Sequence, residues 1–129
     1  MILALRTDKP EAELHLLDTS GNAVATHMWE AHRTLASTLV DEISTFLREH
    51  DSSTRQLTGL ITFTGAGSFT GLRIGTTVAN ALAYSNSIPI VSGEGDDWIS
   101  LGVKKLPTAE IDNYVIPTYD REPNITRPK

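Results

Sequence analysis

A glycine-rich stretch between a predicted strand and a predicted helix is the segment most suited to chemistry. Four glycines fall within residues 65–75, whose sequence is GAGSFTGLRIG. Glycine permits positive φ and close approach of a ligand to the backbone. The free N–H groups at the start of a helix also attract anions. Phosphate-binding loops combine these two properties, so the stretch is a candidate for one.

The spacing of this loop departs from three generic motifs. A P-loop ends in Gly-Lys-Ser/Thr, whereas Leu72 follows Gly71. The dinucleotide motif G-x-G-x-x-G is one residue shorter than the run from Gly65 to Gly71. In the nucleophile motif G-x-S-x-G the serine would come one position later than Ser68. None of the three mechanisms is therefore assigned.

A structural interpretation of the same loop is a tight strand-to-helix turn. In that turn Ser68 or Thr70 would cap the helix and Phe69 would fill the core. Both interpretations use the same set of residues. The candidate loop residues are Gly65, Gly67, Ser68, Phe69, Thr70, Gly71, Arg73 and Gly75.

The histidines do not form a recognisable metal site. His27 and His32 are five residues apart across a strand-to-helix junction, so they lack the i, i+4 spacing of a helical zinc site. No cluster of acidic residues accompanies them. We expect all four histidines to be surface or capping residues. They are His15, His27, His32 and His50.

Three acidic residues precede Trp98, but their spacing is not that of an EF-hand. We expect Glu94, Asp96 and Asp97 to lie at the N-terminus of a short helix, where its dipole favours negative charge. No catalytic residue, metal ligand or cofactor is predicted for this chain.

The elements that position the loop follow from apolar periodicity. Residues 1–29 alternate in three runs and predict an antiparallel three-stranded meander. A helix is predicted over about 31–50, where apolar residues recur every fourth position and should face the sheet. A central strand over 58–64, a helix over 70–84 and an edge strand over 88–91 follow. The first helix's stripe is Leu35, Leu39, Ile43 and Leu47.

This order predicts an α/β fold, a mixed sheet of about five strands with two main helices. A length of 129 residues suits one domain. We expect the lobe to occupy residues 1–98 and a linker with an extended tail to occupy residues 99–129. Three of the six prolines lie in the last thirteen residues, which favours an extended tail.

Composition excludes several classes. The net charge of −5 and the lack of a long basic run argue against direct nucleic-acid binding. The chain has no cysteine, which excludes disulfides, thiolate nucleophiles and cysteine-based metal sites. The longest apolar runs are too short to cross a membrane, and the N-terminus has the pattern of a strand rather than a signal peptide. We expect a soluble, cytoplasmic protein.

The glycine loop closely resembles GPGSFTGLRIG, the signature of the TsaB (YeaZ) family, with Ala66 in place of proline. That family is the accessory subunit in bacterial synthesis of threonylcarbamoyladenosine in tRNA. His32 resembles the family's histidine at the first helix, and residues 116–121, IPTYDR, are similar to its P-x-Y-x-R ending. The resemblance covers most of residues 1–98 and the tail. It implies one ribonuclease-H-like lobe of the actin-like ATPase superfamily.

Two departures from the family favour binding over catalysis. Arg6 stands where the family has an aspartate that, in the superfamily, organises metal and phosphate. The second lobe that would complete a nucleotide cleft is also expected to be lost. The resemblance then implies a non-catalytic subunit. The alternative is a reduced actin-fold phosphotransferase or nucleotide hydrolase that uses residues 65–71.

The family resemblance also implies partners. It implies a TsaD-type subunit bound through the two helices, a TsaE-like ATPase in the same complex, a competing homodimer, and only indirect contact with tRNA. In the second helix, Val78 and Leu82 form a stripe suited to the sheet, which would leave a row of small residues for a partner. The expected partner residues are Ala36, Val40, Gly75, Ala79 and Ala83.

Overall fold

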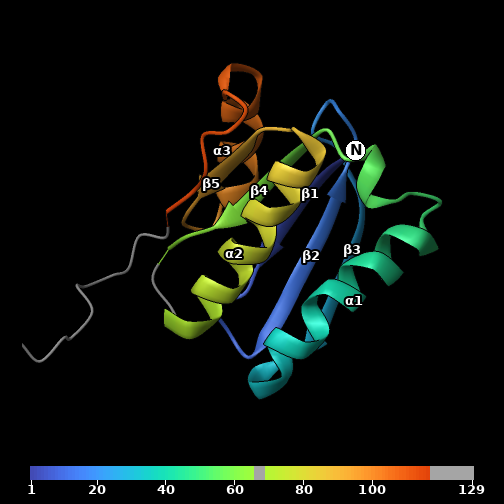
Figure 1. Cartoon of the computed structure of the whole chain (residues 1–129), viewed down its shortest axis with the longest axis vertical. Coiled ribbons are helices and arrows are strands. Elements are labelled where there is room, and N and C mark those ends of the chain that lie inside the picture. The colour runs from blue at the N-terminus through green and yellow to red at the C-terminus, as the bar shows by residue number, and fades with distance from the viewer. Residues whose placement is uncertain (66–68, 117–129) are drawn as a thin grey trace, which may run out of the picture.

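The computed structural model describes residues 1–65 and 69–116, without the side chains of His32 and Phe69. Five strands form one sheet in the order β3-β2-β1-β4-β5 (Figure 1). The strands are β1 (Ile2–Arg6), β2 (Glu11–Leu17), β3 (Ala23–Glu30), β4 (Gly59–Phe63) and β5 (Ile90–Gly93). The helices are α1 (Leu35–Glu49), α2 (Phe69–Asn86) and α3 (Trp98–Lys105), with short 3-10 turns η1 (His32–Thr34), η2 (Thr54–Gln56) and η3 (Leu106–Thr108). The predicted α/β fold, one mixed five-stranded lobe, is confirmed.

The strand register explains where a site can form. β1 pairs antiparallel with β2, with Leu3 opposite Leu16, and parallel with β4, with Leu3 beside Leu60. β4 in turn pairs parallel with β5, which lies at the edge of the sheet as predicted. Because β1, β4 and β5 run in the same direction, their carboxyl ends meet at one edge, the usual place for a site in an open α/β sheet.

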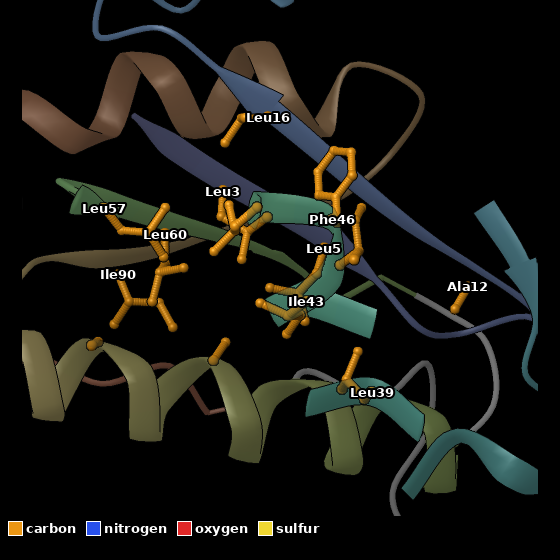
Figure 2. Close-up of a cluster of buried hydrophobic side chains, with 14 of the residues drawn as sticks. Leu3, Leu5, Ala12, Leu16, Leu39, Ile43, Phe46, Leu57, Leu60 and Ile90 are labelled. Atoms are coloured by element: carbon orange, nitrogen blue, oxygen red, sulfur yellow. The ribbon is translucent and has the colours of Figure 1, made fainter. Parts of the chain in front are cut away.

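Helices cover both faces of the sheet. α1 and α2 lie on one face and α3 on the other (Figure 1). The predicted apolar stripe of α1 is fully buried there, and Figure 2 shows Ile43 close to Leu5 of β1. On the opposite face Trp98 of α3 packs in a cluster with Ile61 and Phe63 of β4. The sheet therefore has a separate apolar core on each side.

The turn between β2 and β3 shows how local chemistry sets the chain direction. The Asp18 carboxylate accepts hydrogen bonds from the backbone N–H groups of Ser20 and Asn22, both at 2.9 Å. Gly21 takes φ of 91°, a conformation that favours glycine. The hydrogen bonds with Asn22, Ser20 and Gly21 outweigh the effect of desolvation and lower the pKa of Asp18. This Asx turn matches the predicted break between the two strands.

The lobe continues past the boundary that we expected at residue 98, and that expectation is corrected. α3 packs closely on the sheet, because a β-carbon on Gly102 would overlap the side chain of Ile61. Further along, the Asn80 side chain donates to the carbonyl of Val115 and accepts from its N–H, at 3.0 and 3.1 Å. Residues 99–116 are thus held against α2, β4 and β5. The tail predicted from residue 117 lies outside the described residues.

Candidate functional site

The candidate site lies at the edge where β1 and β4 end. The loop after β1 meets the start of α2 through Thr7, whose Oγ1 donates a buried 2.7 Å hydrogen bond to the carbonyl of Gly71. Gly75 lies one turn later on α2, and a β-carbon there would overlap Thr7 Oγ1. The glycine loop therefore brings the backbone of α2 into direct contact with the end of β1.

An ion pair occupies the end of β1, where the sequence has Arg6 in place of the aspartate expected from the family resemblance. Arg6 Nε donates to Asp8 Oδ1 at 2.7 Å, and Arg6 Nη2 donates to Asp8 Oδ2 at 3.2 Å. The Asp8 side chain is only 4% exposed, and the Arg6 guanidinium lies 3.8 Å from the centre of the Phe63 ring. A cation here would meet a fixed guanidinium, and the nearby carboxylate is already paired. These residues do not fit a divalent metal.

The sheet face beyond this pair carries a second polar network. Lys9 Nζ donates to Glu13 Oε2 and His15 Nε2 donates to Glu13 Oε1, both at 2.9 Å. The His15 ring meets Trp98 edge-on, at 5.7 Å between centres. Burial acts to raise the pKa of Glu13, but the hydrogen bonds from Lys9 and His15 prevail, so the pKa lies below its ordinary value. The network is satisfied internally and joins β2 to α3.

The described histidines all have partners within the lobe. His50 is the C-cap residue of α1 and donates from Nδ1 to the Phe46 carbonyl at 2.9 Å, which confirms the predicted capping role. His15 and His27 differ from the expectation, because they are half-buried links between elements. His27 Nε2 lies 2.7 Å from Glu42 Oε1 and so joins β3 to α1.

The acidic residues before α3 lie where we predicted. Asp97 is the N-cap residue of α3, although its side chain makes no capping hydrogen bond, and Glu94 and Asp96 are exposed beside it. In the described part of the chain, no group of three or more histidines or carboxylates is arranged to hold a metal ion.

Several loop predictions cannot be followed in the structure. Gly67 and Ser68 lie outside the described residues, as does the side chain of Phe69. Gly65, Gly71 and Gly75 are buried, whereas Thr70 and Arg73 are exposed. The described part of the loop is thus a close strand-to-helix junction, with Arg73 directed away from the core.

The predicted partner surface is wrong at three of its five residues. Ala79 and Ala83 are 0% and 1% exposed and belong to the core between α2 and the sheet, and Gly75 is buried against Thr7. Small side chains allow α2 to lie close to the strands, so this row serves the sheet. Val78 and Leu82 are only partly buried, along the same core.

The outer face of α2 remains open and is almost free of charge, and it lies beside the exposed residues Ala36 and Val40 of α1. Val40 is 58% exposed and Tyr84 is 72% exposed, and Ala36 is also exposed. Arg73 is the one charged residue among the 18 of α2. A cavity of about 300 Å³ lies against these helices; its lining is Ala36, Thr70, Arg73, Ile74, Thr77 and Val78. Thr77 and Tyr84 are also exposed on α2, and the sequence prediction did not name them, although the lack of charge along α2 could have pointed to them.

Comparisons with known proteins agree on one family. Residues 28–92, about half of the chain, match the family TsaD, tRNA N6-adenosine threonylcarbamoyltransferase. The structure is similar to YeaZ from Pseudomonas aeruginosa, with a TM-score of 0.65 and 27% identity over 72% of this chain and 43% of that chain. It is also similar to an uncharacterized Pseudomonas aeruginosa protein described as similar to peptidase YEAZ, with a TM-score of 0.66 and 27% identity over 72% of this chain and 42% of that one.

This chain therefore spans less than half the length of either solved relative. A comparison with curated proteins finds no match. None of the helices in the described residues is long and apolar enough to cross a bilayer.

Proposed function

Because the chain belongs to the TsaD family and is a TsaB (YeaZ)-like member of it, we propose that it is a non-catalytic subunit that supports a TsaD-type enzyme. The partner would carry out the threonylcarbamoyladenosine modification of tRNA, and this chain would touch tRNA only indirectly. The chain's net charge of −5 supports that assignment, because direct binding to the tRNA backbone needs clustered positive charge.

The outer face of α1 and α2 is the observation that supports binding. Interface cores are depleted of charged residues and enriched in aromatic ones. Val40 of α1 and Tyr84 of α2 are exposed. Arg73 is the one charged residue of α2. A soluble protein gains nothing from such a face in water, whereas a packed partner would bury it. We assign Ala36 and Val40 to this surface, together with Thr77 and Tyr84.

The Arg6–Asp8 pair supports the absence of catalysis. Its guanidinium takes the place of a metal-organising carboxylate, and its carboxylate is already satisfied. The second candidate, a reduced actin-fold phosphotransferase or hydrolase, would need this position to hold magnesium. Isothermal titration calorimetry with ATP and magnesium should give no measurable heat of binding. Micromolar affinity would refute the non-catalytic assignment.

We further assign the protein to the cytoplasm, where a TsaE-like ATPase would join the same complex. A homodimer would use the same outer face of α1 and α2 and would therefore compete with the TsaD-type subunit. These assignments follow from the family resemblance and from the exposed face of the two helices.

The decisive experiment is co-purification of the TsaD-type subunit of the same organism with the tagged chain. Val40→Lys should abolish capture, because it places a charge in the apolar face. Val24→Lys is the matched control, since Val24 is 48% exposed on β3, away from these helices. Circular dichroism should report folded protein for both variants. Failure of the wild-type chain to capture the TsaD-type subunit would refute the proposed function.

A further inference from the structure

We propose that the outer α1–α2 face has a basic end, formed by Arg33 and Arg73, that receives a carboxylate side chain of the partner protein. This inference rests on the proposed function and adds the chemistry and orientation of docking. It begins from two cavities that adjoin at the N-terminal ends of the two helices.

The first cavity, of about 320 Å³, lies between the β1–β2 loop, η1 and α2. Its floor includes the apolar side chains of Leu35 and Ile74, and its cationic groups are Lys9 and Arg33. Lys9 is already bound to Glu13, at 2.9 Å. Arg33 is exposed and forms no ion pair with any residue in the described ranges. Its guanidinium is therefore available to an incoming anion.

The second cavity is the one of about 300 Å³ on the outer α1–α2 face, and it shares Thr70 and Ile74 with the first. Arg73 lines it and likewise has no ion pair among the described residues. No acidic residue lines either cavity. In a chain with a net charge of −5, this end of the face reverses the overall sign. Such a local field steers a partner of opposite charge.

The opposite end of the same face is aromatic, and there the Tyr114 hydroxyl donates to the Asp112 carboxylate at 2.9 Å. There a hollow of about 390 Å³ is lined by Asn80, Ala81, Tyr84 and Tyr114. The two tyrosine rings are 6.5 Å apart. The two ends of the face therefore differ, with cations at the start of α2 and tyrosines near its end. A partner helix would lie with its acidic residues toward Arg33 and Arg73.

A protein carboxylate suits this end better than a nucleic acid or a free anion. Guanidinium groups bind carboxylates and phosphates alike. The apolar floor under Arg33, however, matches the methylene groups of a glutamate or aspartate. The uncharged surface continuing along α2 then gives a protein, but not a small ion, further area to bury. The acidic remainder of the chain opposes a nucleic-acid backbone.

Charge reversal tests the proposal. Arg33 lies in η1 and Arg73 in the first turns of α2, where an acidic residue is compatible with the helix dipole, so Arg33→Glu and Arg73→Glu should fold. The association rate with the TsaD-type subunit should be measured at low and at physiological salt. We expect the double variant to associate about tenfold more slowly at low salt and to lose most of its salt dependence. Arg55→Glu in η2 is the matched control and should associate as the wild type does.

The outcomes distinguish failure of the basic docking end from failure of the proposed function. Suppose that Val40→Lys abolishes the complex but the double variant associates with the wild-type rate and salt dependence. That result would overturn the basic docking end and leave the proposed function standing. The proposal would also be overturned, in favour of a free-anion site, by a second result. In that result inorganic phosphate binds the free chain through both arginines, and their reversal leaves partner association unaffected. Rescue of the double variant by a glutamate-to-lysine change in the partner would confirm the pairing.

Discussion

Gly75→Ala is the sharpest test of how α2 is seated on β1. A β-carbon at residue 75 would overlap the Oγ1 atom of Thr7, which donates a buried hydrogen bond to the Gly71 carbonyl. The added methyl group must therefore displace Thr7 or lift the start of α2. Either movement opens the junction between the end of β1 and the glycine loop.

The expected magnitude combines opposing effects. Alanine favours the helix over glycine by about 1 kcal/mol. Overpacking costs about 1–3 kcal/mol. Loss of the Thr7 hydrogen bond costs about 0.5–1.5 kcal/mol more. The costs exceed the gain in helix propensity, so we expect Gly75→Ala to lower the free energy of unfolding by about 0.5–3.5 kcal/mol.

Urea denaturation followed by circular dichroism measures this change. Ser85→Ala, at an exposed position of α2, is a control for helix propensity without overlap. The double variant Thr7→Ala, Gly75→Ala removes the obstructing oxygen and should be less destabilised than the sum of the single changes. Close approach of α2 to Thr7 would be refuted if Gly75→Ala matched or exceeded the wild type in stability.

Two further predictions follow from burial and charge. Ala79→Arg should unfold the protein rather than only dissociate it, because Ala79 is fully buried in the core under α2; a folded but dissociated variant in light scattering and circular dichroism would contradict this placement. The lowered pKa of Glu13 means that its stabilising effect is complete above the ordinary glutamate pKa of 4.5 and is lost as the pH falls through the lower folded value. Glu13→Gln should therefore reduce the loss of stability on acidification, measured as urea midpoints at about pH 7 and pH 3; an unchanged pH dependence would exclude this role for Glu13.

Much of the fold could be predicted because the periodicity of apolar residues is a local property. The stripe from Leu35 to Leu47 required a helix against a sheet, and residues 58–64 required a central strand. The glycine loop was recognisable from its residues alone, and the structure places its described part at a strand-to-helix junction. Each of these inferences depends only on which side chains are neighbours in a strand or a helix.

Tertiary structure alone decided which neighbour each face meets. The row of Gly75, Ala79 and Ala83 indicates close approach, but spacing does not say whether the approaching element is a strand or a partner. The parallel pairing of β1 with β4 places Thr7 beneath Gly75, and the row is buried there. The contact of the Arg6 guanidinium with the Phe63 ring was hidden for the same reason, because Phe63 comes from the neighbouring strand β4. Contacts between strands distant in sequence are a property of the folded chain, and they bury the row of small residues that the sequence prediction left for a partner.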